Sequence, residues 1–401
     1  MKINFTITEL PCYAIAHKNG RKTLDMQAFD GQIEFALQYT YDRDRRPLRL
    51  VSPIKENDKV EVVILPHRIE LYINGEIKDK EWPMDERLFE KGDEIRSNIE
   101  ISVSDYTAEE TVEPDVCGEF ENAEGWQPYE NVFVGDCMPY TKDGEYHVLY
   151  LIDRHHHTSK WGLGGHEWGH ISTKDLNSWK IHPTAVPLTD SAEGSFCTGS
   201  WLRDGDKEYL YYTVRLKPGV DRPVRRSISS DGYHYEKDAS FRFSIPKKYR
   251  GFTARDPKLI KGTDGLYHML LTTTLLEEAR GCVAHFVSPD MEEWTDKGPI
   301  FVSPDNTEPE CPDYIEYNGR YYLIYSLHGQ AHYLISDKPF EDWREPANSN
   351  IPCAVVPKGA VWSDKIVFAG FKRVTGNAYA GKMTFKSAYA DENGELVFCD
   401  L

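Results

Sequence analysis

The sequence predicts an all-β protein, a five-bladed β-propeller that follows a smaller β-sandwich-like domain. Two recurring markers support this prediction: a polar turn that leads into an aromatic-rich strand, and a Ser–Asp–aromatic segment that follows it. Between the copies the sequence has no long helical periodicity. Repeated units of about 50 residues with several short strands each are typical of propeller blades.

The first marker is an Asp-Gly or Asn-Gly turn, which favours the positive φ angles of tight hairpins. The aromatic and β-branched residues beside these turns predict strands. Copies of the turn begin at Asp143, Asp204, Asp264 and Asn318, and a weaker fifth copy begins at Ser363. Five copies predict five blades.

The second marker starts with Ser, continues with Asp after a short gap, and ends with an aromatic residue. A β-sandwich with coincidental Asp-Gly turns is the alternative architecture, but two linked markers in a constant order favour the propeller. The copies run from Ser172 to Trp179, Ser229 to Tyr235, Ser288 to Trp294 and Ser336 to Trp343.

The first part of the chain does not share the repeat. Residues 60–65 and 69–73, followed by Asn74-Gly75, predict two strands and a hairpin turn, and the acidic stretch 107–115 predicts a linker. We therefore expect an N-terminal β-sandwich-like domain over 1–115, with a packing role rather than a sugar-binding role. The propeller, which we expect to be the catalytic domain, follows over 116–401.

Composition limits the partners and the compartment. The chain has 65 acidic and 47 basic residues and a formal net charge of −18, which disfavours nucleic acids and anionic membranes because both attract basic surfaces. The N-terminal ten residues lack the apolar core of a signal peptide. The eight cysteines form no C-x-x-C pair, a pattern typical of single thiols in a reducing compartment. We expect a cytoplasmic protein that uses no cofactor and takes a small, neutral oligosaccharide or glycoside; the oligomeric state stays open.

Three acidic residues lie at similar places in three repeats. Asp136 lies eight residues before the turn glycine of its repeat, while Asp256 and Glu310 each lie nine residues before theirs. Equivalent positions at the start of the innermost strands of a propeller approach one central axis. Crowded carboxyls repel one another, which raises some pKa values and lets one carboxyl stay protonated as an acid. The pattern predicts a glycosidase-like site.

Several segments carry a resemblance to glycoside hydrolase family 32, the β-fructofuranosidases. Ala254-Arg255-Asp256-Pro257 resembles the Arg-Asp-Pro motif of that family, and Glu310-Cys311-Pro312-Asp313 resembles its Glu-Cys motif. Residues 168–179 resemble its Trp-Gly-His…Ser-x-Asp-Leu-x-x-Trp segment, and Cys197-Thr198-Gly199-Ser200 stands where the family has Ser-Gly-Ser. The motifs occur in the family's order over roughly 126–345, and the resemblance implies a five-bladed propeller.

The resemblance also implies the role of each acid: Asp136 as nucleophile, Asp256 as transition-state stabiliser and Glu310 as acid/base. A retaining glycosidase needs two carboxyls about 5–5.5 Å apart, one to attack the anomeric carbon and one to protonate the leaving oxygen. An ionised aspartate beside an arginine can hold sugar hydroxyls as oxocarbenium charge develops. We assign Arg255, Trp161 and Thr198 to substrate binding.

The nucleophile segment departs from the family pattern. Where the family has Trp-Met-Asn-Asp-Pro-Asn-Gly, this chain has Phe133-Val134-Gly135-Asp136-Cys137-Met138-Pro139. Gly135 and Met138 replace two asparagines, which removes polar contacts that help to recognise fructose. The family's β-sandwich normally follows its propeller, whereas here the extra domain precedes it.

The sequence around the histidines does not predict a metal site. His166 and His170, four residues apart, would suit zinc on a helix. Their Gly- and Trp-rich surroundings predict loop and strand instead, and the histidine-rich run 155–157 is typical of a solvated loop. We therefore assign no metal ligand.

Three functions stay open. The first is a retaining β-fructofuranosidase-like hydrolase that cleaves a furanosidic bond. The second is an inverting, arabinan-type furanosidase, favoured if the altered nucleophile segment means that water attacks. The third is a non-catalytic sugar-binding propeller, which would have no need of the proton donor that this chain retains.

Overall fold

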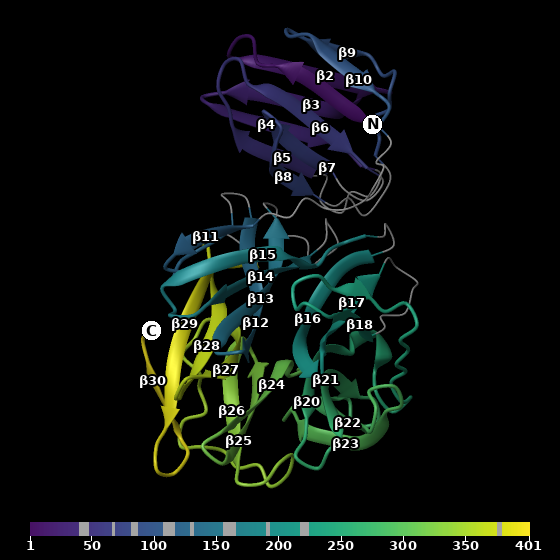
Figure 1. The fold of residues 1–401 in the computed structure, drawn as a ribbon. Coiled ribbons are helices and arrows are strands. Elements are labelled where there is room, and N and C mark those ends of the chain that lie inside the picture. Colours follow the sequence, from purple (N-terminus) through teal and green to yellow (C-terminus); the bar gives the residue numbers. More distant parts are fainter. Residues whose placement is uncertain are drawn as a thin grey trace. The chain divides into compact units, whose positions relative to one another are not determined.

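The computed structural model describes residues 1–39, 48–65, 69–81, 87–106, 117–128, 132–154, 166–189, 193–216, 224–374 and 379–401. Within these ranges every regular element is a strand except one 3₁₀ turn, Gly251–Thr253 (Figure 1). None of the described residues forms a helix long and apolar enough to cross a membrane. The predicted all-β class is confirmed.

The chain divides into two compact units. One comprises residues 1–114 with 154–165 and 188–195, and the other comprises 115–153, 166–187 and 196–401. The domain limits 1–115 and 116–401 expected from the sequence stay a prediction.

The N-terminal unit is a sandwich of two antiparallel sheets. Its first sheet has the order β10 (Ile101–Ser104), β1 (Lys2–Thr6), β6 (Lys59–Ile64), β7 (Ile69–Ile73) and β8 (Glu76–Glu81). Its second sheet has the order β5 (Leu48–Pro53), β4 (Gln32–Leu37), β3 (Arg21–Phe29), β2 (Cys12–Lys18) and β9 (Ile95–Ser97).

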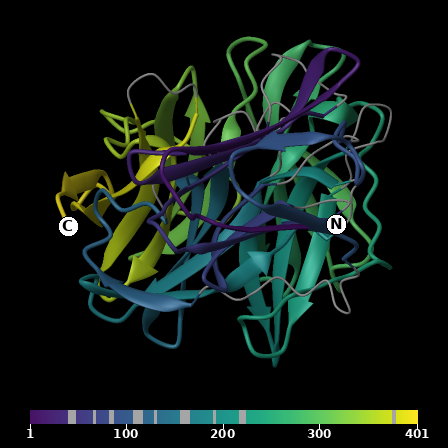
Figure 2. The same ribbon diagram turned by 90° about the horizontal axis from the view of Figure 1, so that it is seen from above.

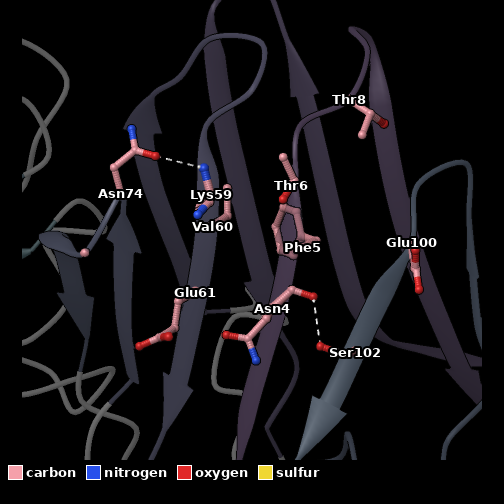
Figure 3. Close-up of a pocket in the computed structure, with 11 residues that line it drawn as sticks. Asn4, Phe5, Thr6, Thr8, Lys59, Val60, Glu61, Asn74, Glu100 and Ser102 are labelled. Carbon is pink, nitrogen blue, oxygen red and sulfur yellow. Dashed lines mark hydrogen bonds between the residues drawn. The ribbon is translucent and has the colours of Figure 1, made fainter.

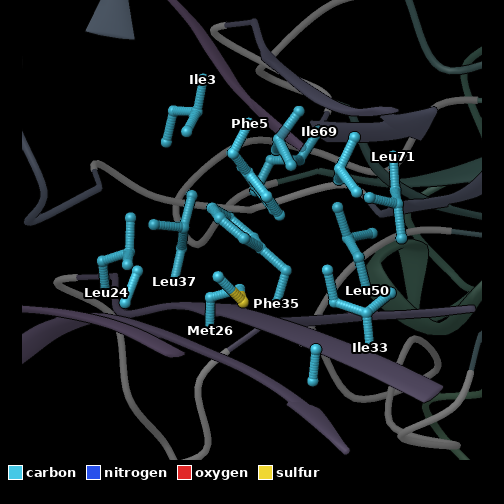
Figure 4. Close-up of a cluster of buried hydrophobic side chains, with 14 of the residues drawn as sticks. Ile3, Phe5, Leu24, Met26, Ile33, Phe35, Leu37, Leu50, Ile69 and Leu71 are labelled. Atoms are coloured by element: carbon cyan, nitrogen blue, oxygen red, sulfur yellow. The ribbon is translucent and has the colours of Figure 1, made fainter. Parts of the chain in front are cut away.

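Alternating apolar side chains from both sheets form one core in this unit. Ile3 and Phe5 come from β1, and Phe35 comes from β4 of the other sheet (Figure 4). The alternation works because successive side chains of a strand point to opposite faces of its sheet. The predicted hairpin at Asn74-Gly75 joins β7 to β8, and both residues have positive φ, 54° and 85°.

The second unit is the five-bladed propeller (Figures 1 and 2). Each blade is an antiparallel sheet, and the chain supplies an additional strand, β11, that pairs with the outer strand of blade 1. One backbone pair, Val134 with Gly381, joins blade 1 to blade 5, so the last blade meets the first. Blade 1 contains β11 (Gly118–Glu121), β12 (Val132–Lys142), β13 (Glu145–Arg154), β14 (Glu167–Thr173) and β15 (Ser178–Val186); blade 2 contains β16 (Glu193–Asp204), β17 (Lys207–Leu216), β18 (Val224–Ser229) and β19 (Glu236–Lys237); blade 3 contains β20 (Arg255–Lys261), β21 (Tyr267–Leu275), β22 (Arg280–Ser288) and β23 (Thr295–Val302); blade 4 contains β24 (Glu310–Tyr317), β25 (Arg320–Leu327) and β26 (Gln330–Ser336); blade 5 contains β27 (Val355–Trp362), β28 (Lys365–Arg373), β29 (Gly381–Ala390) and β30 (Leu396–Cys399).

The apolar cores of this unit lie between neighbouring blades. Leu270 of blade 3 packs in one cluster with Tyr314 and Leu323 of blade 4. A second cluster joins Tyr322 of blade 4 to Phe368 of blade 5. Because each blade buries both faces against its neighbours, its strands are apolar on both sides, which explains why alternation is weak in this half of the sequence.

The second marker forms a hydrogen-bonded turn at the end of the third strand. In blade 3 the Ser288 hydroxyl accepts the Met291 N–H at 2.9 Å, and Asp290 accepts the Glu292 N–H at 2.9 Å. In blade 1 the hydroxyl of this turn belongs to Thr173 rather than to Ser172, and it accepts the Leu176 N–H at 2.9 Å. Ser172 is thereby left with a different set of contacts.

Candidate functional site

The innermost strands of blades 3, 4 and 5 share a β-bulge at their start. The strand register shifts between Arg255 and Lys258, between Glu310 and Asp313, and between Val355 and Lys358. One residue within each bulge has a positive φ: Asp256 at 59°, Cys311 at 52° and Val356 at 41°. Positive φ is unfavourable for residues with a Cβ and is concentrated at functional sites, and bulges re-aim side chains beside such sites.

This common geometry corrects the register inferred from the sequence. The bulges align Asp256 with Cys311, and Arg255 with Glu310, so Asp256 and Glu310 are not equivalent positions. The reason is the hairpin length. Lys261 pairs with Tyr267 in blade 3, whereas Tyr317 pairs with Arg320 in blade 4, so counting back from the turn glycine shifts blade 3 by a residue.

Asp256 is buried, with 3 % of its surface exposed, and is surrounded by donors. The Thr198 hydroxyl donates to Oδ1 at 2.6 Å, and the Cys311 N–H donates to Oδ2 at 3.1 Å. The Arg255 Nε lies 3.5 Å from Oδ2. These donors from three residues fix the position of the Asp256 carboxyl group.

Cys311 connects Asp256 to Asp136. Its sulfur lies 3.7 Å from Oδ2 of Asp256 and 3.8 Å from Oδ2 of Asp136. Burial raises the pKa of the Cys311 thiol well above its ordinary value, and the charges of the two aspartates raise it further. The sulfur is therefore a neutral, weak donor between two carboxylates of different blades, and it is not a nucleophile.

Gly135, which stands beside Asp136, leaves room for the Tyr379 ring. A Cβ at position 135 would lie 2.7 Å from the Tyr379 hydroxyl and 3.0 Å from the Leu151 Cβ. The Asp136 N–H donates to that hydroxyl at 3.1 Å. Tyr379 of blade 5 thus lies next to Asp136, in the space that Gly135 leaves open.

We expect Gly135→Ala to destabilise the protein by about 1–3 kcal/mol, the usual cost of overpacking a core. The double variant Gly135→Ala/Tyr379→Phe should regain part of this loss, because the closest clashing atom is removed. Urea unfolding midpoints measure both effects. Gly118→Ala is the matched control, since its Cβ would meet nothing nearer than 3.8 Å; additive losses in the double variant would contradict the assignment of the clash to the hydroxyl.

Glu310 is joined to the other acids through Arg255. The Arg255 Nη2 lies 3.1 Å from Oε1 of Glu310, and its Nη1 pairs with Glu308. Burial lowers the pKa of Arg255, but the carboxylates of Asp256, Glu310 and Glu308 outweigh it and raise the pKa overall. Burial likewise raises the pKa of Glu308, and Arg255 with nearby hydroxyls reverses this to a net lowering.

The three acids differ in their access to solvent. The Glu310 side chain is 43 % exposed, whereas that of Asp256 is 5 % exposed. Contacts through Cys311 and Arg255 thus bring together one carboxyl from each of blades 1, 3 and 4. The most accessible of them is the carboxyl expected to meet a leaving group.

The predicted binding residues have different outcomes. Arg255 lies within the cluster, where its guanidinium contacts the carboxylates of Asp256, Glu308 and Glu310 and the Thr253 carbonyl. Thr198 is fully buried, and its hydroxyl proton is directed to Asp256, so its contact here is with the acid. Trp161 lies outside the described residues, and its role stays a prediction.

Several residues near the acids were not found from the sequence. Tyr379 and Glu308 belong to segments without a motif, and the buried pair Asp153–His166 (2.7 Å) lies nearby, with the His166 ring 5.4 Å from that of Tyr379. His166 directly precedes strand β14 and His170 lies within it. At about 3.3 Å per residue, their Cα atoms are about 13 Å apart. These two histidines therefore do not share a metal ion.

A second set of charged residues, Lys258, Asp313 and Lys358, lies two residues after the positive-φ residue of each bulge. Lys258 pairs with Asp313 at 2.5 Å, and the other oxygen of Asp313 accepts the Gly359 N–H at 2.9 Å. Lys358 donates to the Gly199 carbonyl at 3.0 Å. These contacts join blades 2, 3, 4 and 5 beside the bulges.

A shallow groove also lies on the outer face of the first sheet in the N-terminal unit, with a volume of about 910 Å³ (Figure 3). Its lining includes the polar residues Asn4, Thr6, Lys59, Glu61 and Glu100. Phe5, the aromatic residue among the eleven that line it, is 6 % exposed. The groove therefore offers hydrogen-bonding groups but no aromatic surface on which a sugar ring could stack.

Comparisons with known proteins show what the chain resembles. Residues 135–347 match the model of the glycosyl hydrolases family 32 N-terminal domain. The chain is 30 % identical over 199 residues to a sucrose-6-phosphate hydrolase of Bacillus subtilis (strain 168), a match that covers 45 % of this chain and 40 % of the relative. The chain thus spans less than half of that relative's length.

Solved structures show the same fold at low sequence identity. A fructan 1-exohydrolase IIa from Cichorium intybus, in complex with 1-kestose, superposes with a TM-score of 0.58 at 17 % identity, covering 70 % of this chain and 60 % of that chain. A sucrose-6-phosphate hydrolase from Lactobacillus gasseri superposes with a TM-score of 0.54 at 17 % identity, covering 68 % and 63 %. The fold is therefore shared with proteins of low sequence identity.

Proposed function

Because this chain belongs to glycoside hydrolase family 32, we propose that it hydrolyses the furanosidic bond of a small β-fructofuranoside-like substrate with retention. One observation supports this most: Asp136, Asp256 and Glu310, from three blades, are linked by direct contacts through Cys311 and Arg255. The names of the relatives, which include sucrose-6-phosphate hydrolases and a fructan exohydrolase, point to the same substrate class.

In this proposal Asp136 attacks the anomeric carbon and Glu310 protonates the leaving oxygen, then deprotonates the water that releases the sugar. Asp256 is held by Thr198, Cys311 and Arg255 and accepts hydrogen bonds from sugar hydroxyls as positive charge develops on the ring. Arg255 positions both Asp256 and Glu310. The enzyme is favoured over a sugar-binding propeller because the chain keeps Glu310, a solvent-accessible carboxyl that can serve as a proton donor.

The proposal also includes the compartment, the class of partner and the role of the N-terminal unit. Eight free cysteines fit a cytoplasmic protein. The net charge of −18 fits a small oligosaccharide partner rather than nucleic acid or a membrane surface. We assign the N-terminal β-sandwich, residues 1–115, a packing role, because its groove presents no exposed aromatic ring.

A substrate screen tests the proposal. The full chain is incubated separately with sucrose, sucrose 6-phosphate, 1-kestose and an arabino-oligosaccharide, and released monosaccharides are quantified. We expect release from at least one fructoside and none from the arabinoside. Release from the arabinoside alone would replace the fructofuranosidase assignment with the arabinan-type one, and binding without release from any sugar would favour the non-catalytic propeller.

A further inference from the structure

Three histidines of blade 1 meet on neighbouring strands, away from the innermost strand that carries Asp136. His147 lies on β13, His170 on β14 and His182 on β15. His170 is paired directly with His182, and His147 with Ser172, two residues along the same face. One ring nitrogen from each histidine lies within 4.8 Å of those of the other two. His147 and His170 are buried, and His182 is partly exposed.

The hydrogen bonds of this cluster do not use all of its nitrogens. His147 Nδ1 lies 3.0 Å from His170 Nε2, and the Tyr140 hydroxyl lies 3.1 Å from the same Nε2. In the described part of the chain, Nδ1 of His170 has no hydrogen-bond partner, although the residue is fully buried. A buried polar atom without a partner is costly and calls for an explanation such as a bound ion.

The third histidine, His182, has hydrogen bonds of the kind that connect a metal-binding histidine to a carboxylate. The Ser172 hydroxyl donates to Glu145 at 3.2 Å and lies 2.8 Å from His182 Nε2. Since that hydroxyl has one proton, His182 Nε2–H donates to Ser172, and the lone pair of His182 is on Nδ1. Metal-binding histidines commonly donate their other N–H to a group that leads to a carboxylate.

The protonation and charge of the site suit a cation. Burial lowers the pKa of His147 to about 3 and that of His182 to about 4, so both rings are neutral at pH 7, the form that binds metals. Lys142, whose ammonium acts on all three histidines, pairs with Glu208 at 2.6 Å. Its charge is therefore largely compensated.

Blade 3 shows what the same positions look like without a third histidine. His268 follows Tyr267 as His147 follows Tyr146, and its Nδ1 lies 2.9 Å from His285 Nε2. There the Phe340 ring stacks on His268 at a centroid distance of 3.8 Å. A histidine pair alone is therefore explained by packing between strands, whereas blade 1 adds a third nitrogen donor.

We propose that His147, His170 and His182 bind one divalent transition-metal ion of the Zn²⁺ class, which cross-links the three outer strands of blade 1. Three imidazoles without a carboxylate ligand favour such ions over Mg²⁺ or Ca²⁺. The site could not be predicted from the sequence, because its members are 23 and 12 residues apart in chain order on separate strands. The proposal is independent of the glycosidase assignment.

The test uses the full chain without an affinity tag, freed of metal by chelation. Titration with ZnCl₂ by calorimetry should show one tight site per chain, and Zn²⁺ should raise the Tm by a few degrees, as binding to the folded state requires. His182→Gln, at the partly exposed member, should weaken Zn²⁺ binding at least about 10-fold and abolish the rise in Tm. His285→Gln is the matched control, because it removes a buried histidine of blade 3, and it should leave Zn²⁺ affinity unchanged.

Substitution with Co²⁺ supplies a readout on the unmodified protein. We expect a visible absorption band typical of four-coordinate, nitrogen-ligated Co²⁺, which Zn²⁺ should displace. Absence of tight Zn²⁺ binding to the unmodified chain would overturn the proposal, and so would equal losses in His182→Gln and His285→Gln. Either result would leave the cluster as a hydrogen-bonded histidine network.

Discussion

Asp136→Asn is expected to abolish turnover, with kcat lower by about 10⁴-fold or more, while the protein stays folded. The amide has the size of the carboxylate but cannot attack the anomeric carbon. The neighbouring contacts explain why folding should survive: the backbone N–H of residue 136 still donates to Tyr379, and the Cys311 thiol can donate to the amide oxygen.

A rate assay on the best substrate of the screen and a thermal denaturation curve measure the two halves of this prediction. Asp143→Asn is the matched control, since Asp143 lies in the exposed turn of the same blade and already has a positive φ of 50°, which asparagine tolerates. It should keep full activity. An Asp136→Asn protein with substantial kcat would remove Asp136 from the nucleophile role.

Glu310→Gln is expected to slow a natural substrate by about 10²–10⁴-fold, the usual contribution of general acid catalysis. Glutamine keeps the size and most hydrogen bonding but has no proton to transfer. An aryl furanoside needs little protonation of its leaving group, so formation of the glycosyl-enzyme should suffer less. Its breakdown would lack the base, and a burst of aryl product should appear before the steady state.

Glu308→Gln provides the comparison, because Glu308 also pairs with Arg255 but is not expected to transfer a proton. Loss of that pairing should slow both substrates by a similar factor, without a burst. Steady-state rates and stopped-flow traces of both variants test whether Glu310 transfers the proton. If Glu310→Gln behaves as Glu308→Gln does, Glu310 only positions the sugar, and the acid must be another group.

The number of blades was predictable because the turn after the first strand of each blade has a short, local sequence signal. Asp143-Gly144 and Asn318-Gly319 adopt the positive φ angles that their residue types favour, so the turns could be read from adjacent residues. The order of the acids along the chain was also visible. Their spatial register was not, because the longer hairpin after Lys261 offsets blade 3 by a residue from blade 4.

Contacts between distant segments could not be predicted from the sequence, for a different reason. Tyr379 lies beside Asp136 although 243 residues separate them, and nothing near either residue specifies the other. The absent asparagine at Gly135 suggested a loss of polar contacts, whereas the structure places the Tyr379 hydroxyl there. The histidine cluster of blade 1 depends likewise on strand pairing, which only the folded sheet defines.

The central claim, that Asp136 is the nucleophile of a retaining furanosidase, has one direct measurement: mass spectrometry of Glu310→Gln quenched during turnover of an aryl furanoside. We expect one glycosyl residue to become covalently attached, and peptide mapping should place it on Asp136. The adduct should disappear in the double variant Asp136→Asn/Glu310→Gln. Turnover of the aryl substrate with no adduct, or an adduct on another residue, would contradict the account.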